Sequence, residues 1–356
     1  MSEPQQTQKI HAGQSHPVRA AIVGMGSWGQ NLVNHTQGKS DGLIRFTTGA
    51  TRTPARAVEF SQKHGIRMLD SYEAVLADPE VDAVVLATPH SMHAEQIMAA
   101  ARAGKHVYTE KPLGLDSRES AAAVQACADA GVTLAVGYNW RFQPALQEIR
   151  RMLDDGRLGR LLHMEGNFCG PSAYRWPRGH WRQDRDETPA GGMTGRGVHV
   201  ADAMLYLAQS RIESVVAQSF RLAQDFGADD TTSMLFRFRS GATAYLGTVI
   251  ASAETWRLQV FGAKGWAEVG AVEHLNTWQL RVSFIDPANV LNKRPPEVMT
   301  FPDTSTERAE LEHFARAIMA GQALAVPGGD EVHNVVALET ILQSAESGQP
   351  MAVPAG

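Results

Sequence analysis

A lysine and a glutamate stand together at the end of one apolar run, in "VYTEKPLG" at residues 107–114. The run predicts a buried strand, and Pro112 stops it because proline cannot donate a hydrogen bond to a sheet. An ammonium group at such a strand end can donate a hydrogen bond to a developing alkoxide or exchange a proton with a hydroxyl group. The simpler interpretation is a solvated salt bridge between Glu110 and Lys111.

Lys111 can exchange a proton efficiently at neutral pH only if its pKa is lowered. The ordinary pKa of lysine is ~10.4, so burial and the absence of a close carboxylate would have to lower it. Neighbouring side chains on a strand point to opposite faces, so Glu110 need not hold the ammonium group in an ion pair.

A second chemical pattern is the glycine-rich stretch "GMGSWG", which follows the apolar run "VRAAIV" and begins a predicted helix. Gly24 permits a tight turn, Gly26 lets the backbone approach a pyrophosphate, and Gly29 allows the helix to pack on the strand. The helix amino terminus supplies N–H groups and a positive dipole to phosphates. We therefore expect a dinucleotide at Gly24, Met25, Gly26, Ser27, Trp28 and Gly29.

Another predicted strand, "VDAVVLATP", is followed by two histidines at the start of a helix. The alternative for each histidine is an exposed residue at a helix start. Ligands of doubly wound sheets collect at the carboxyl ends of the strands, which favours contact with the ribose and nicotinamide of a cofactor. On this basis the candidate cofactor-binding residues at the two strand ends are Thr88, Pro89, His90, His93, Glu110 and Lys111.

The residues beyond the second predicted strand bear on the choice of cofactor. A NAD site usually presents Asp or Glu about 20 residues beyond the glycine motif, and residues 49–52 contain neither. Thr51 offers a hydroxyl group there, and Arg52 and Arg56 offer guanidinium groups, which can clamp a 2′-phosphate that a carboxylate would repel. We predict NADP(H); the alternative is that Arg52 stacks on the adenine and serves NAD(H) equally well.

These groups require a particular set of elements to position them. Short apolar runs alternate with helical segments up to Tyr138, which predicts a parallel sheet with right-handed crossovers. Longer alternating runs such as "TTSMLFRFRS" and "ATAYLGTVIA" follow, and they predict antiparallel strands. The expected fold class is α/β: an N-terminal doubly wound parallel (Rossmann) sheet, then an α+β domain with a large, mostly antiparallel open sheet.

Length and composition suit two domains. The 356 residues exceed one ordinary core, and we divide them into a disordered leader (1–16), a dinucleotide-binding domain (17–138) and a substrate-binding and oligomerisation domain (139–356). A net charge of -5 without a Lys/Arg block argues against nucleic-acid or membrane partners. Two cysteines and no metal-ligand spacing among the histidines favour the reducing cytoplasm and no bound metal.

Five stretches in order resemble one known family: "GMGSWG", "ATPHSMHAEQ", "ARAGKHVYTEKPLG", "GYNWRFQPAL" and "GVHVAD". They are similar to motifs of the glucose-fructose oxidoreductase, inositol dehydrogenase and rhizopine catabolism family, over nearly the whole chain. The resemblance implies hydride transfer between a nicotinamide cofactor and a hydroxyl or carbonyl, often of a sugar, cyclitol or dihydrodiol. It also implies that Lys111 reaches the substrate, and that the second sheet forms an oligomer interface.

The resemblance further implies that His199 is catalytic. The family pattern commonly reads Asp-x-Gly-x-His before this helix, but Gly195 stands at the aspartate position. Asp202 shares a helix face with His199 and is a candidate to replace the missing carboxylate. The alternative is that His199 is a structural histidine at a helix start.

Two further segments supply substrate-binding candidates. Asn139 and Arg141 lie where the chain leaves the first domain, and Arg141 is either an interdomain hydrogen-bond donor or a substrate contact. Residues 173–187 are dense in aromatic and basic groups; Trp181 and its neighbours either bind a ring substrate beside an anion, or pack against another subunit. The substrate-binding candidates are thus Lys111, Asn139, Arg141, Trp181 and His199.

The expected function is an NADP(H)-dependent oxidoreductase that acts on a small sugar, cyclitol or cyclic diol, as a homodimer or homotetramer. Two alternatives remain: a glycosidase that uses transient oxidation by a tightly bound cofactor, and a non-enzymatic cofactor sensor. A sensor does not need Lys111 and His199 together, so their joint presence favours an enzyme.

Overall fold

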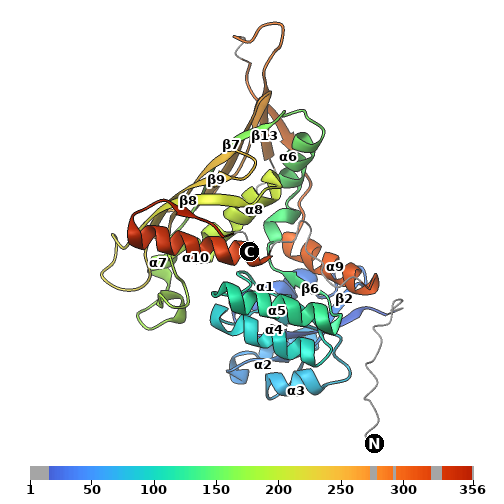
Figure 1. Ribbon diagram of the computed structural model, residues 1–356. Helices are drawn as coiled ribbons and strands as arrows, with labels where there is room; N and C mark the ends of the chain where they lie inside the picture. The colour runs from blue at the N-terminus through green and yellow to red at the C-terminus, as the bar shows by residue number, and fades with distance from the viewer. Residues whose placement is uncertain (1–15, 273–278, 292–293, 322–330, 355–356) are drawn as a thin grey trace, which may run out of the picture.

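The computed structural model describes residues 16–272, 279–291, 294–321 and 331–354, and two sheets dominate it (Figure 1). All but the last residue of the expected leader lies outside the described residues. Within the described residues, no helix is both long and apolar enough to cross a membrane.

The first sheet is parallel throughout, as predicted, with the strand order β3-β2-β1-β4-β5-β6. Its central strands are buried along their whole length, which explains their near-continuous runs of apolar residues. The strand order reverses between β1 and β4, the position where ligands of such sheets bind. The strands are β1 (Val18–Val23), β2 (Ile44–Ala50), β3 (Arg67–Met68), β4 (Ala83–Leu86), β5 (His106–Thr109) and β6 (Leu134–Val136).

Helices connect these strands, and a side chain just before the first helical residue caps two of them, α3 and α5. Ser71 accepts a hydrogen bond from the backbone N–H of Ala74 at the start of α3, and Asp116 accepts two from backbone N–H groups at the start of α5. Such caps satisfy N–H groups that have no partner within the helix. The helices are α1 (Ser27–Thr36), α2 (Val58–His64), α3 (Tyr72–Ala77), α4 (His93–Arg102) and α5 (Ser117–Ala130).

The second sheet has the order β14-β13-β12-β11-β7-β10-β9-β8-β15, and β7 with β10 is its one parallel pair among the residues that the structure describes. Burial alternates along most of its strands, as expected when only one face is covered. The strands are β7 (Leu161–Cys169), β8 (Ile212–Phe220), β9 (Thr231–Phe238), β10 (Thr243–Val249), β11 (Thr255–Gly262), β12 (Gly265–Val269), β13 (Gln279–Phe284), β14 (Glu297–Thr300) and β15 (Met351–Ala352).

Helices α6 (Pro144–Asp154), α8 (Val198–Ala208) and α10 (Glu331–Ser347) cover one face of the second sheet (Figure 1). The opposite face bears a row of apolar side chains on three adjacent strands: Val216, Leu235 and Tyr245, each at least 38% exposed. A contiguous apolar row in water is typical of a surface that binds a partner.

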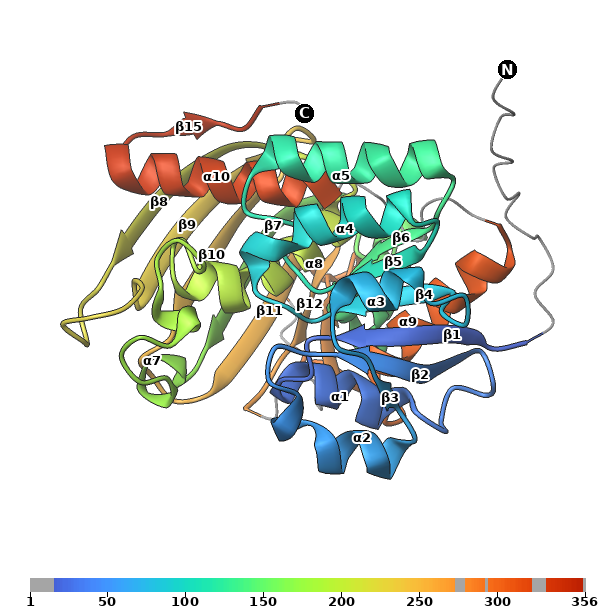
Figure 2. The same cartoon turned by 90° about the horizontal axis from the view of Figure 1, so that it is seen from below.

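Helix α9 (Thr306–Met319) belongs to the C-terminal part of the chain but packs on the first sheet (Figure 2). Leu311, Phe314 and Ile318 from this helix share a buried cluster with Ile22 and Phe46 of the first sheet. The chain division at residues 138 and 139 thus does not separate the two cores, because α9 returns across it.

Candidate active site

A cavity of about 790 Å³ lies at the carboxyl ends of β1, β2, β4 and β5 and faces residues 168–199 of the second domain. Most of the residues predicted for the site line it, although they come from segments far apart in the sequence. The predicted residues in the lining are Gly24, Met25, Gly26, Ser27, Trp28, Thr51, Arg52, Arg56, Thr88, Pro89, His90, Glu110, Lys111, Trp181 and His199. Gly29, His93, Asn139 and Arg141 are not among the lining residues.

The glycine motif fits a dinucleotide. Gly24 has a φ of +92°, and a Cβ there would lie 2.5 Å from the carbonyl oxygen of Ala87. A Cβ at Gly29 would lie 2.0 Å from the carbonyl oxygen of Gly24, so Gly29 is needed for packing rather than for contact with a ligand. At Gly26 no atom lies within 4 Å of the Cβ position, and the residue faces the cavity. A side chain at Gly26 would occupy space that a phosphate needs beside the start of α1.

Thr51, Arg52 and Arg56 line the cavity just beyond β2, and Asp70 lines it beyond the neighbouring strand β3. The sequence reasoning missed Asp70, because it considered only the end of the second strand. The short strand β3 beside β2 is the signal that would have found it. This end of the cavity therefore carries two guanidinium groups and one carboxylate.

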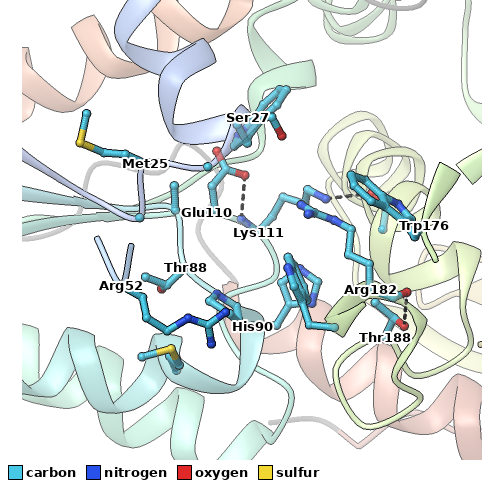
Figure 3. Close-up of a pocket in the computed structure, with 18 of the residues that line it drawn as sticks. Met25, Ser27, Arg52, Thr88, His90, Glu110, Lys111, Trp176, Arg182 and Thr188 are labelled. Carbon is cyan, nitrogen blue, oxygen red and sulfur yellow. Dashed lines mark hydrogen bonds between the residues drawn. The ribbon is translucent and has the colours of Figure 1, made fainter. Parts of the chain in front are cut away.

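Lys111 projects into the centre of the cavity (Figure 3). Its ammonium group donates a hydrogen bond to the carbonyl oxygen of Gly195, at 2.8 Å. Burial lowers the pKa of Lys111 to about 8, Glu110 opposes this effect, and the cations Arg182 and Arg196 add to it. Burial thus lowers the pKa as proton exchange near neutral pH requires, but the carboxylate of Glu110 is close and acts against the shift.

Glu110 lies next to Lys111 but its carboxylate has other contacts. It accepts a hydrogen bond from the backbone N–H of Lys111 at 3.3 Å, and the hydroxyl group of Tyr108 lies 3.5 Å away. Burial raises the pKa of Glu110. The ammonium group and the carboxylate therefore do not form the simple solvated salt bridge that the sequence left open.

The two histidines after β4 have different environments. His90 lines the cavity, its Nδ1 is 2.7 Å from the carbonyl oxygen of Glu187, and burial holds its pKa well below the ordinary value. His93 is buried beneath, with ring nitrogens 2.8 Å from the carbonyl oxygen of Pro112 and 3.1 Å from that of Thr88. His93 thus links two strand ends, and His90 presents a neutral imidazole near Lys111.

Residues 173–187 form one wall of the cavity, and hydrogen bonds within the segment hold it in place. The Gln183 side-chain amide donates to the carbonyl oxygens of Ala173 and Trp176, at 3.0 and 3.1 Å, and so closes the segment on itself. Arg182 lies over the ring of Trp181, 4.1 Å from its centroid. The ring of Trp181 meets His90 of the first domain edge-on, 5.4 Å between centroids.

His199 and Asp202 lie on the same helix but have different roles. His199 lines the cavity and stacks on Trp140, with 5.6 Å between ring centroids. Asp202 is fully buried and accepts hydrogen bonds from Arg141 at 2.6 and 2.8 Å and from Asn334 at 3.0 Å. The expectation that Asp202 replaces the carboxylate missing at Gly195 is not met.

The contacts of Asn139 and Arg141 tie elements together. The Asn139 amide donates to the hydroxyl group of Thr306 at 3.1 Å, which attaches the linker to the start of α9. Arg141 binds the buried Asp202 carboxylate through two of its nitrogens. Both residues have protein partners just outside the cavity.

Comparisons with known proteins agree with this architecture. Residues 18–138 match the family described as "Oxidoreductase family, NAD-binding Rossmann fold", and residues 146–268 match "GFO/IDH/MocA C-terminal domain". A D-xylose 1-dehydrogenase (NADP(+)) of Haloferax volcanii is 32% identical over 304 residues, which is 84% of this chain and 89% of that protein. A scyllo-inositol 2-dehydrogenase (NAD(+)) of Bacillus subtilis is 28% identical over 363 residues, 94% of this chain and 96% of that protein.

Among solved structures, a putative NADPH-dependent oxidoreductase from Desulfitobacterium hafniense superposes with a TM-score of 0.84. The superposition covers 96% of this chain and 99% of that one, at 22% identity. At this identity the likeness concerns the fold alone, and it extends over both sheets.

Proposed function

The chain belongs to the GFO/IDH/MocA oxidoreductase family, and from that premise we propose that it is an NADP(H)-dependent oxidoreductase of sugar-like or cyclitol-like hydroxyl groups. The observation that carries the proposal is Lys111, with a pKa lowered to about 8, in the cavity that the glycine motif also lines. A lysine with this pKa has a much larger fraction of neutral amine near neutral pH than a surface lysine has, so it can accept a proton there.

Different residues of the cavity would bind the cofactor, transfer the proton and orient the substrate. The backbone of Gly24, Gly26 and Ser27 would hold the pyrophosphate at the start of α1. The nicotinamide, when bound, would supply the acceptor or donor of hydride. Lys111 would take the proton from the substrate hydroxyl on oxidation and return it on reduction, through Nζ. His199, stacked on Trp140, would orient the same hydroxyl group by a hydrogen bond.

The preference for NADP(H) is the finer part of the proposal. Arg52 and Arg56 are available to a 2′-phosphate at the end of β2, where a NAD site would present a carboxylate. Asp70 beyond β3 opposes this preference by its charge. Two guanidinium groups outweigh one carboxylate here, because each can form charge-assisted bonds with a phosphate. One relative is named as an NADP(+) enzyme and another as a NAD(+) enzyme.

The test is a turnover assay with purified protein. Aldoses, inositols and cyclic dihydrodiols are offered with NADP+ and with NAD+, and the absorbance of the reduced nicotinamide is followed. We expect reduction of NADP+ with at least one of these substrates. Failure to bind either cofactor would count against the proposal. An aryl glycoside is offered in the same assay; its cleavage without net cofactor reduction would instead support a glycosidase that uses transient oxidation.

A further inference from the structure

The charge of the cavity is unbalanced. Among its described lining residues, six carry a positive charge and two are carboxylates. Arg52, Arg56 and Asp70 line the cofactor end, so two positive charges stand against one negative charge there. The other end has one carboxylate, Glu110, and the larger surplus of positive charge, carried by Lys111, Arg175, Arg182 and Arg196.

Not all of these cations are available to a ligand. Arg196 is paired with Glu254 through two bonds, Nη1 to Oε1 at 2.6 Å and Nη2 to Oε2 at 3.1 Å. Arg175 is exposed at the edge of the cavity. Lys111 and Arg182 remain, and Figure 3 shows both side chains directed into the same part of the cavity from opposite walls.

Arg182 differs from Arg196, which is paired, and from Arg175, which is more exposed. Within the part of the chain that the structure describes, its guanidinium group has neither an ion pair nor a hydrogen bond; its contacts are with the rings of Trp181 and Trp176, at 4.1 and 5.4 Å. Burial lowers its pKa from the ordinary value. The charge of Glu110 opposes this effect. A guanidinium group that has lost part of its water without a bonded anion is costly, and an anionic ligand would reduce that cost.

Gly195, in the same domain as Arg182, leaves room beside Lys111 and brings no charge of its own, while the carboxylate of Glu110 lines the cavity on the Lys111 side. No atom lies within 4 Å of the Cβ position of Gly195, so this residue leaves open space beside Lys111. The partner of the Lys111 ammonium group is a neutral carbonyl oxygen. An acidic side chain at Gly195 would fit and would neutralise the cations, and the sequence has none there.

We propose that the substrate carries a carboxylate in addition to its hydroxyl groups, as a sugar acid or a carboxylated cyclitol does, and that Arg182 binds this carboxylate. Lys111 then faces the reacting carbon–oxygen bond. The inference rests on the proposed function and names the substrate class of the same site. A planar guanidinium fork matches a carboxylate with two bonds, while the flanking tryptophan rings hold it in one plane.

The first experiment compares matched pairs on the enzyme loaded with NADP+: D-glucuronate against D-glucose, and D-galacturonate against D-galactose. Binding is measured by quenching of tryptophan fluorescence, because Trp176 and Trp181 flank Arg182, and turnover by kcat/KM. We expect the acid of a pair to bind about 10- to 100-fold more tightly, the range for charge-assisted hydrogen bonds. Equal or tighter binding of the neutral sugars in both pairs would overturn the inference. D-Glucose 6-phosphate is the third ligand; tighter binding of this phosphate than of the carboxylates would also overturn it.

Variants of Arg182 test whether this residue causes the preference for the acid. Arg182→Gln should abolish the preference for the acid and leave NADP+ affinity unchanged, whereas Arg182→Lys should retain part of it. The matched control is Arg178→Gln: Arg178 lies in the same segment, is exposed, and pairs with Asp225 outside the cavity lining. If Arg182→Gln weakened NADP+ binding and left the acid preference intact, Arg182 would be a cofactor contact and the inference would fail.

The converse test introduces a negative charge beside the cations at Gly195. Gly195→Asp should lower the affinity for D-glucuronate at least 10-fold and improve the relative affinity for D-glucose, because it neutralises the cations where there is space for a side chain. Gly195→Asn controls for size. If the enzyme reduces NADP+ with neutral sugars at rates that the Arg182 and Gly195 variants do not change, the inference fails but the proposed function stands. The proposed function fails if neither cofactor binds at all.

Discussion

Lys111 and Gly195 join the two domains across the cavity, because the ammonium group at the end of β5 donates to a carbonyl oxygen of the second domain at 2.8 Å. The acceptor is a main-chain oxygen and carries no charge that would stabilise the ammonium form. Burial lowers the pKa of Lys111 to about 8, even though the neighbouring carboxylate of Glu110 opposes the shift. A substrate hydroxyl group that enters here competes with Gly195 for the same proton.

Removal of the Lys111 amine should affect turnover far more than cofactor binding. We expect Lys111→Met to lower kcat about 10²- to 10⁴-fold, the contribution typical of a general acid or base. The dissociation constant for NADP(H) should change little. Steady-state kinetics and fluorescence titration measure the two quantities. The control is Lys39→Met, since Lys39 bonds to the carbonyl oxygen of Asn34 on the surface; a Lys111→Met enzyme with most of its turnover would refute the role of Lys111.

The pH profile should report the same group. Oxidation requires the neutral amine as proton acceptor, so kcat/KM for oxidation should rise with pH and level off above an apparent pKa of about 8. Reduction requires the ammonium form, so its rate should fall as pH rises through the same value. Initial rates in both directions between pH 6 and pH 10, as a rough span around this pKa, test the sign. Profiles of the same sign in both directions would contradict the assignment.

Arg52 should decide between the cofactors. Charge-assisted bonds to a phosphate contribute roughly 1.5–3 kcal/mol each, so Arg52→Ala should weaken NADP(H) about 10- to 150-fold and leave NAD(H) nearly unchanged. Dissociation constants of both cofactors for the wild type and the variant measure the effect. Equal affinities in the wild type, unaltered by Arg52→Ala, would show that Arg52 only stacks on the adenine. Asp70→Asn should act in the opposite sense and strengthen NADP(H) binding.

The buried pair of Arg141 and Asp202 should matter for folding. Loss of one partner leaves a charge without compensation in the core, so Asp202→Ala should lower the free energy of unfolding by about 3–5 kcal/mol. Asp225→Ala removes the partner of Arg178 in an exposed pair and should cost no more than about 1 kcal/mol. Denaturant unfolding compares the two. If the two variants lost the same free energy of unfolding, the buried Arg141–Asp202 pair would stabilise the fold no more than the exposed pair does.

Self-association through the second sheet is the expectation for its uncovered face. Leu235 is 55% exposed at the centre of the apolar row, between Val216 and Tyr245. We expect a dimer or tetramer in light scattering at micromolar concentration, and a smaller species for Leu235→Arg. Leu222→Arg is the control, because Leu222 is exposed in the loop beyond β8. A monomeric wild-type protein would exclude this interface.

Several features of the site followed directly from the order of residues. A glycine motif after a strand, with Thr88 and Lys111 after two later strands, predicts one shared edge, because parallel strands all present their carboxyl ends on the same side. The departure at Gly195 was equally visible. Asp70 was missed because nothing in its own neighbourhood distinguishes it from a residue at a helix start; only the pairing of β3 with β2 brings it to the cavity.

The sequence by itself determined the two architectures, the glycine cradle and the lysine at a strand end, because periodicity and turn residues act over short stretches of chain. Only the tertiary structure decided which groups meet. The partner of Lys111 is 84 positions away, the partner of Arg141 is 61 away, and α9 crosses back to the first sheet. Such contacts depend on how whole layers pack, so the choice between a substrate contact and a structural pair was open for Arg141 until its neighbours were in place.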